Sequence, residues 1–420
     1  MKIEFEQIVE RGCGIDIHKK VLVATIRGKG LKEQTRSYSS FTNSIEDLRD
    51  WLKEQKISHV AMESTGVYWK PVYNILETDF EVLLVNARHI KNVPGRKTDK
   101  KDSKWITKLL LSGLLRGSFI PPKEIRELRD LTRYRKKVVE SVSAEKNRLH
   151  KILEDANIKL SSVVSNMSGA VATKIIKAML EGEEDIEELV KFHHGKMKAS
   201  KEELASSLYG YLTEHHRLML RFLRKSMEDK ENLLLELDEQ IQIKLQAASL
   251  ELDAELLETI PGVGKEAAAS ILAELGNDMS HFPSSKHLAS WAGLSPGNNE
   301  SAGKKKSSRI THGNKYLRTL LVQCAWAATR TKNTYLRSKY DSLVARRGKK
   351  KALIAVGHKI LIAIYHILQD KVVYKDLGAD HLENLNKDKQ IKHHIKRLRE
   401  LGMDENILQT LQRQNKKKAA

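Results

Sequence analysis

The sequence predicts a chain of mixed class, with an α/β region at the N-terminus and an all-α remainder. Three observations lead to this prediction. Residues 12–87 alternate short apolar runs with amphipathic stretches, which is typical of strands separated by helices. From about residue 123, apolar residues recur at spacings of three and four, which indicates long paired helices. Residues 317–331 and 351–368 are apolar helical stretches that follow a basic loop rich in glycine.

The N-terminal elements are expected in the order of a ribonuclease H-like fold, namely three hairpin strands, a helix, a strand, a helix and a strand. This order places the first and fourth strands together on the sheet. In chain order we expect two strands joined by a turn at 18–20 within residues 12–28, a strand at 35–39, a helix at 44–55, a strand at 59–63, a helix from about 67, a strand at 81–87, and a helix that starts near 99–102.

Two acidic residues lie in apolar strands. Asp16 is flanked by Ile15 and Ile17, so its side chain points to the opposite face from both. Glu63 ends the apolar run that starts at residue 59. Because an isolated buried carboxylate is costly, each should be paired, protonated or bound to a cation. The fold order predicts that these two carboxyl groups meet.

A second pair of acids, Asp99 and Asp102, stands in a basic stretch just before an amphipathic run. Their spacing puts them on one face of a helix start, where simple capping of the helix would also explain them. If all four acids converge, a hard divalent cation with oxygen ligands is the natural counter-charge, and Mg²⁺ suits phosphodiester chemistry at such a site.

The middle of the chain is predicted to form a coiled coil. One apolar stripe runs from Ile125 to Ala156 and includes Tyr134, and a second runs from Leu204 to Leu245. Between them, residues 157–199 have a shorter period and suggest small helices and loops. The stripes are packing surfaces. We expect that they join two subunits; the alternative is a pair folded on itself within one chain.

Composition indicates a polyanionic partner. The 420 residues include 74 Lys and Arg against 54 Asp and Glu, giving a formal charge of +20, for which nucleic acid is the usual explanation and an inert basic surface the alternative. No apolar run approaches the roughly 20 residues of a membrane span, and the polar start is unlike a signal peptide, so no membrane partner is expected. Two cysteines, Cys13 and Cys324, fit a reducing cytoplasm.

Residues 258–269 resemble a helix-hairpin-helix. Gly262 and Gly264 permit a close turn, and the free amides before and at Lys265 could hold a phosphate without reading sequence. An ordinary helix connection containing proline and glycine is the alternative.

The loop at 291–318 is basic and contains an exposed Ser301. A serine hydroxyl needs a base, a cation or a metal environment before it acts as a nucleophile at neutral pH, so a phosphate-gripping loop is the simpler alternative. The cations expected to contact phosphates are Lys304, Lys305, Arg309, Lys315 and Arg318. The segments expected overall are 1–120 (acidic-site domain), 121–250 (coiled coil and helical linker), 251–375 (helical domain with the serine loop) and 376–420 (a frayed basic tail).

Several short motifs in fixed order resemble the DEDD transposases of the IS110 insertion-sequence family, over roughly residues 10–370. The motifs are Gly-Ile-Asp-Ile-His-Lys at 14–19, Met-Glu-Ser-Thr-Gly-Val-Tyr-Trp at 62–69, Lys-Thr-Asp-Lys-Lys-Asp at 97–102, Ile-Pro-Gly-Val-Gly at 260–264, Gly-Leu-Ser-Pro at 293–296, Ser-Ala-Gly-Lys at 301–304 and Ile-Thr-His-Gly-Asn-Lys-Tyr-Leu-Arg at 310–318.

The resemblance implies a RuvC-like ribonuclease H domain, a coiled coil and a C-terminal transposase domain whose serine completes a composite active site. Asp16, Glu63, Asp99 and Asp102 would bind Mg²⁺, and Ser301 would form a phosphoserine with DNA. It further implies a dimer or tetramer in the prokaryotic cytoplasm, near the nucleoid, acting on donor and target DNA paired by a structured bridge RNA.

Two positions depart from the family pattern. Many members have Ser-Gly-Gly-Lys or two serines where residues 301–304 read Ser-Ala-Gly-Lys, and an arginine often follows the proline where Gly297 stands. Two other functions compete with recombination. One is a RuvC-like nuclease that resolves branched DNA with metal-activated water, and the other is a non-catalytic scaffold that binds RNA or DNA.

Overall fold

The computed structural model describes residues 8–64, 66–86, 102–167, 169–297, 299–307 and 309–402. The chain divides into two compact units, residues 1–120 and 121–420, and each is considered by itself. The first unit is mixed α/β with a five-stranded sheet, and the second is mostly helical. The expected classes of the two regions are therefore confirmed.

The sheet of the first unit has the strand order β3-β2-β1-β4-β5. The first three strands pair antiparallel, whereas β4 lies parallel to β1 and β5 lies parallel to β4. The predicted order of strands and helices is correct, and the third strand is longer than expected because it begins at Leu31. The elements of this unit are β1 (Arg11–Ile17), β2 (Val21–Gly28), β3 (Leu31–Ser39), α1 (Thr42–Glu54), β4 (His59–Glu63), α2 (Trp69–Leu76), β5 (Glu81–Val85) and α4 (Asp102–Leu111).

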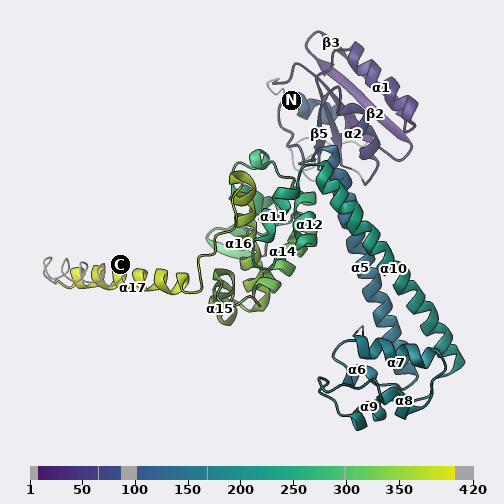
Figure 1. Ribbon diagram of the computed structural model, residues 1–420. Helices are drawn as coiled ribbons and strands as arrows, with labels where there is room; N and C mark the ends of the chain where they lie inside the picture. The colour runs from purple at the N-terminus through teal and green to yellow at the C-terminus, as the bar shows by residue number, and fades with distance from the viewer. Residues whose placement is uncertain are drawn as a thin grey trace. The chain divides into compact units, whose positions relative to one another are not determined.

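Each face of the sheet has its own core. On one face, Ile15 and Met62 pack against α1 and α2 through residues such as Leu48 and Leu76 (Figure 1). On the other face, the helix α4 packs against Ala61 through Ile106 and Leu109, among others. The alternation of side chains along β1 and β4 separates these two sets. The sheet is therefore a central layer with helices on both sides.

The second unit begins with two long helices, α5 (Lys123–Asp155) and α10 (Glu214–Ala247), which lie side by side (Figure 1). The two predicted stripes therefore pack against each other within one chain, and the expectation that they join two subunits is wrong for these buried faces. The segment that connects α5 to α10 forms short helices, which make a cap at one end of the pair. The shorter period of residues 157–199 predicts the small helices up to that point, and the cap continues to residue 208. The cap helices are α6 (Leu160–Val163), α7 (Ala170–Leu180), α8 (Ile186–Val190) and α9 (Lys201–Leu208).

The predicted second stripe is partly wrong. It treats Leu204 to Leu245 as one helix, but α9 ends at Leu208 and α10 begins at Glu214 after a Thr213 cap. The actual contact face of α10 runs through Leu220, Leu223, Leu237, Ile241 and Leu245. The exposed members of the predicted stripes are Tyr134 of the first and Tyr211, His215, Leu218 and Phe222 of the second.

The C-terminal part of the second unit is a helical domain around α16 (Lys349–Asp370), whose buried residues include Val356, Ile360 and Ile364. By length and composition α16, alone among the described helices, could cross a membrane, so the expectation that no apolar run approaches this length is wrong. Half of its apolar window is buried, as in a core helix. Its neighbours are α11 (Glu251–Glu258), α12 (Lys265–Leu275), the 3-10 turn η2 (Met279–His281), α13 (Ser285–Trp291), β6 (Asn299–Ser301), β7 (Lys304–Ser307), α14 (Lys315–Ala328) and α15 (Tyr335–Arg347).

The basic tail is not frayed over its first part. Residues 381–400 form the helix α17 (His381–Glu400), and the helical spacing of good helix formers there outweighs its high charge. The expected tail beyond residue 402 lies outside the described residues.

Candidate active site

Asp16 and Glu63 lie on neighbouring strands at the same edge of the sheet. In the parallel pairing of β1 with β4, Ile15 stands opposite Met62. The next residue along each strand is Asp16 on β1 and Glu63 on β4. Opposed residues in a parallel ladder point to the same face, so the two carboxyl groups share one face and one edge. The Asp16 side chain is 19 % exposed, which leaves it open to a ligand.

The helix α4 covers the face to which these acids point. A methyl group on Gly14 would stand 2.5 Å from the carbonyl oxygen of Ser103 and 2.5 Å from the backbone nitrogen of Thr107. Since side chains alternate along a strand, Asp16 faces the same way as Gly14. Because α4 starts at Asp102, beside Ser103, its first turn lies next to the acidic edge.

A buried network of hydroxyl groups fixes α4 on the sheet. The Thr107 hydroxyl accepts a hydrogen bond from the Gly14 N–H at 3.0 Å and lies 2.9 Å from the carbonyl oxygen of Thr25. The Ser103 hydroxyl lies 2.8 Å from that of Thr25. Thr25, Ser103 and Thr107 are all buried. These bonds set both the position and the rotation of α4, and with them the position of Asp102.

The expected metal site is only partly assembled. Asp16 and Glu63 share a face of the sheet and Asp102 begins the helix that covers this face, but within the described residues no three His, Cys, Asp or Glu side chains form a group that could hold a metal ion. Asp99 lies outside the described residues. The Asp16 carboxylate instead accepts a contact from the exposed His18 ring, with 3.1 Å between Nε2 and Oδ2. The oxygen donors present are of the kind that Mg²⁺ prefers.

Ser301 lies in the second unit, at the tip of a β-hairpin. It ends β6 and pairs with Lys304 of β7, so Ala302 and Gly303 form a two-residue turn. Both turn residues have positive φ, +50° for Ala302 and +74° for Gly303, which is typical of a type I′ turn. A non-glycine residue in this left-handed region is strained by roughly 1–2 kcal/mol. The sequence predicts that Ser301 lies in a loop, and in the structure this loop is a β-hairpin.

The base of this hairpin is held by backbone contacts. The Thr311 N–H donates to the Ser295 carbonyl at 3.1 Å, and the Gly297 N–H donates to the Arg309 carbonyl at 2.7 Å. Below them, Gly293 and Gly313 meet so closely that a methyl group on Gly313 would stand 2.3 Å from the Gly293 nitrogen. Only glycine permits this approach.

A buried carboxylate connects the base of the hairpin to the coiled coil. Glu274, which is 3 % exposed, forms a paired contact with Arg133 of α5 at 2.7 and 2.8 Å and also accepts from the Asn314 amide at 2.6 Å. The Asn314 Oδ1 in turn caps α14 by accepting from the N–H groups of Tyr316 and Leu317. Arg129 donates to the Glu274 carbonyl oxygen at 2.9 Å.

Of the residues expected to bind phosphates, one is explained by packing and most of the others are exposed. Gly262 is explained by packing, because its missing side chain leaves room for α14, and a methyl group on Gly262 would stand 2.4 Å from the Cys324 carbonyl oxygen. Gly264 and Lys265 are exposed at the start of α12, which follows α11 after a short connection, as expected for the predicted helix-hairpin-helix. Of the cations after the hairpin tip, Lys304, Arg309 and Lys315 are exposed and Arg318 is half-buried, whereas the side chain of Lys305 lies outside the described residues.

Comparison with known families identifies the chain. The DEDD transposase model of IS110 elements matches residues 13–158, and the model of the IS116/IS110/IS902 transposase family matches residues 254–341. Together the two matches cover more than half of the sequence. This chain belongs to the IS110 family of transposases. The first match contains all four predicted acids, and the second contains Ser301, so all five candidate residues lie within the matched parts of the IS110-family chain.

Individual relatives agree with this assignment. The IS110-family chain is 35 % identical over 141 residues to a pilin gene-inverting protein of Moraxella lacunata and 36 % identical over 120 residues to its counterpart in Moraxella bovis. These matches cover 32 % and 28 % of this chain, and only 43 % and 37 % of those relatives. A putative transposase of Sinorhizobium fredii is 22 % identical over 324 residues, which is 76 % of this chain and 71 % of the relative.

Sequence reasoning missed the residues that hold the candidate site in place. Thr25, Ser103 and Thr107 are ordinary strand and helix residues, and only their burial in three dimensions reveals their contacts. Glu274 carries a weak signal, because it is an acid in the apolar, alanine-rich helix 265–275, where a buried charge requires a partner. Asn314 carries a clearer signal, since asparagine just before an apolar helical run is typical of an N-cap.

Proposed function

We propose that this IS110-family chain is a DNA recombinase of an insertion sequence, which cuts and rejoins donor and target DNA through a covalent phosphoserine. Family membership makes an enzyme acting on DNA the coarse assignment. The observation that carries the finer proposal is the shared edge and face of Asp16 and Glu63, next to the first turn of α4. Two adjacent carboxyl groups of this kind are expected where a cation is bound.

Asp16, Glu63, Asp99 and Asp102 would hold Mg²⁺ in a RuvC-like ribonuclease H domain. When bound, the ion would stabilise the negative charge that develops on the phosphate oxygens. The hydroxyl network under α4 supports this role, because a catalytic carboxylate must be held within a fraction of an ångström of its working position. His18, in contact with Asp16, would help to orient that carboxylate.

Ser301 would be the nucleophile. Its oxygen would form an ester bond with the phosphorus while the sugar oxygen leaves and takes up the proton, and a sugar hydroxyl of another strand would later reverse the step. The energy of the broken bond stays in the ester, so resealing needs no nucleotide cofactor. The hairpin supports this role because the backbone of Ser301 pairs with that of the exposed Lys304, and backbone hydrogen bonds hold the base of the hairpin.

The proposed partners are nucleic acids and further copies of the chain. The formal charge of +20 supports a large nucleic-acid surface, for which donor DNA, target DNA and a structured bridge RNA are the proposed occupants. The acids lie in one unit and the serine in the other. We infer that a composite site draws the serine from a second subunit, as expected for a homodimer or homotetramer.

Trapping the protein on nicked DNA tests the proposal. The wild-type chain, supplied with its element DNA, RNA and Mg²⁺, should give a protein–DNA adduct that survives a denaturing gel. Ser301→Ala should remove the adduct while binding persists, and Ser307→Ala, on the same hairpin, should keep it. Asp102→Asn should remove both adduct and strand cleavage. Cleavage without any adduct in the wild type would instead favour the RuvC-like nuclease, and binding without cleavage would favour the scaffold.

A further inference from the structure

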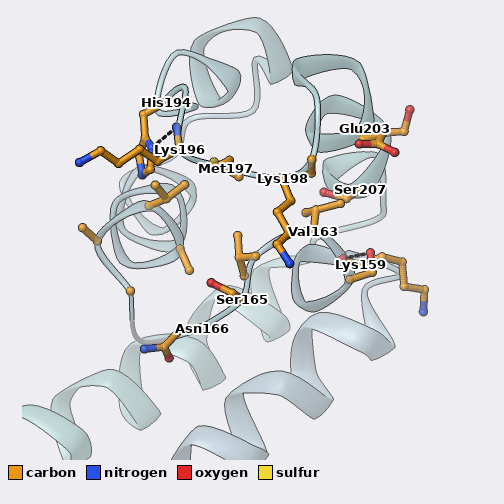
Figure 2. A pocket seen from close by; sticks show the side chains of 18 of the residues that line it. Lys159, Val163, Ser165, Asn166, His194, Lys196, Met197, Lys198, Glu203 and Ser207 are labelled. Atoms are coloured by element: carbon orange, nitrogen blue, oxygen red, sulfur yellow. Dashed lines mark hydrogen bonds between the residues drawn. The ribbon is translucent and has the colours of Figure 1, made fainter. Parts of the chain in front are cut away.

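The cap on the coiled coil contains a large surface pocket. It has a volume of about 1060 Å³ and lies between residues 159–172 on one side and residues 194–207 on the other (Figure 2). Neither family match reaches it, because the first ends at residue 158 and the second begins at residue 254. The candidate active site also does not use it. The pocket therefore needs an explanation of its own.

Cations line this pocket. Lys159, Lys196 and Lys198 all border it. Lys159 is paired with Glu154, but in the part of the chain that the structure describes neither Lys196 nor Lys198 has an acidic partner within ion-pair distance. Figure 2 shows the Lys198 side chain extending into the pocket toward Val163 and Ser165. An unpaired lysine that extends into a pocket is suited to an anionic ligand.

Backbone donors lie on the same wall. The pocket is lined by Gly169, Ala170, Val171 and Ala172, which are the N-cap and first turn of the eleven-residue helix α7. Gly169 provides no side-chain cap, and among the described residues no acceptor lies on the N–H groups of Ala170, Val171 or Ala172. These free amides add to the lysine, since both favour a bound anion.

The rest of the lining is mixed. Val163, Val171 and Met197 give it an apolar floor, and each packs partly against the core of the cap. Ser165 and Asn166 add polar groups below Lys198 in Figure 2. An apolar floor beside a cationic wall is suited to a ligand that has both an uncharged part, such as a planar ring or a sugar, and a negatively charged part.

The acidic residues of the lining do not cancel this preference. Glu202 and Glu203 belong to the first turn of α9, where they face the N-terminal amides of that helix. Glu203 accepts from the Ser200 N–H at 2.7 Å in a capping box, so its carboxylate is already committed. In Figure 2 Glu203 lies at the rim, away from Lys198.

We propose that this pocket binds one nucleotide of a single-stranded nucleic acid, with the phosphate on Lys198 and the free amides of α7 and the base or sugar on the Val163–Met197 floor. A single strand fits this chemistry because its unstacked bases can enter a pocket, whereas the bases of a duplex are stacked inside it. RNA and DNA share the phosphate and base chemistry, so the experiment compares the two.

The test uses the full-length chain and short oligonucleotides that carry 4-thiouridine or 4-thiothymidine for photocrosslinking. Crosslinked peptides identified by mass spectrometry should include the segments 159–172 or 194–207. Single-stranded probes should label them and a duplex should not. Stronger labelling by the RNA probe would identify RNA as the ligand, and stronger labelling by the DNA probe would identify single-stranded DNA. Both results support the site.

Two matched variants separate this site from general charge. Lys198→Gln removes the pocket lysine, while Lys174→Gln removes an exposed lysine of α7 that does not line the pocket. Loss of one phosphate contact should lower the slope of log affinity against log salt by about 0.7 for a single strand. Only Lys198→Gln should show this smaller salt dependence and lose the crosslinks to the cap. Equal effects of the two variants, or crosslinks confined to other parts of the chain, would overturn the proposal. Neither result depends on Ser301 chemistry.

Discussion

Gly14 of β1 and Thr107 of α4 are in direct contact, with the Gly14 N–H donating to the Thr107 hydroxyl at 3.0 Å and no room for a side chain between the two backbones. This contact fixes how α4 lies on the sheet. It therefore decides how close the first turn of α4, with Asp102, comes to the edge that carries Asp16 and Glu63.

Adding a methyl group at this contact should displace α4. In Gly14→Ala the new methyl would stand 2.5 Å from backbone atoms of α4, which cannot yield as a flexible side chain can. We expect the free energy of unfolding of the first unit to fall by about 1–3 kcal/mol, as for other overpacked sites. Urea unfolding followed by circular dichroism measures this change. Gly195→Ala is the control, because nothing lies within 4 Å of its added methyl group. Equal stability of the two variants would show that α4 adapts to the change.

Removing the buried charge of Glu274 should loosen the base of the serine hairpin. Glu274→Gln leaves Arg133 and Arg129 without their anionic partner, and loss of one partner of a buried pair typically costs about 3–5 kcal/mol. We expect about 3 kcal/mol, the lower end of this range, because the Arg133 side chain is 34 % exposed and can reach water. Thermal or urea unfolding measures the loss.

The control for this variant is Glu228→Gln on α10, which breaks an exposed pair with Arg224. Such a pair contributes at most about 1 kcal/mol. If Glu274→Gln were no more destabilising than Glu228→Gln, the buried network would not hold the hairpin.

The turn beside Ser301 should be sensitive to the residue at position 302. Ala302 has φ of +50°, which glycine adopts without strain and which a β-branched residue strongly resists. Ala302→Gly should form adduct at least as fast as the wild type, and Ala302→Val should be slower. The initial rate of adduct formation measures this order. An unchanged rate for Ala302→Val would mean that the turn conformation does not position the nucleophile.

Both cysteines should be protected until the chain unfolds. Cys13 is fully buried and Cys324 is 3 % exposed, and burial raises the pKa of both thiols, that of Cys324 to about 11. Because the thiolate is the reactive form, both should resist thiol reagents in the native state at neutral pH. Labelling followed by mass spectrometry across a urea series should show Cys13 reacting when the first unit opens and Cys324 when the second does. Rapid labelling of either in buffer would contradict this burial.

The sequence was most informative where a local pattern decides the structure. Alternation and turn residues predict β1, β2 and β4 nearly to the residue, and the spacing of apolar residues predicts α5. The second stripe fails because Thr213 and His216 form a capping box that starts a new helix, and a three-four pattern does not register such a break. The helix α15 was missed because its charged sequence has almost no apolar face.

The candidate site also has one part that the sequence predicts and another that it does not. The strand order makes β1 and β4 neighbours, and the alternation of buried apolar residues along both strands sets the register that brings Asp16 beside Glu63. The contacts of Glu274 could not be predicted, because Arg133 lies 141 residues away in sequence and only the packing of α12 on α5 brings the two together. The pocket of the cap could not be predicted either, because its lining comes from several short segments, none of which is a motif.

Peptide mapping of the trapped protein–DNA complex tests the central claim most directly. After nuclease digestion of the adduct formed by the wild-type chain, mass spectrometry should find the remaining nucleotide on Ser301, and it should find none on Ser295 or Ser307 of the same region. The adduct should disappear in Asp16→Asn although that acid lies in the other unit. A nucleotide attached to any other residue, or an adduct that forms without Asp16, would contradict a composite site of serine and acids.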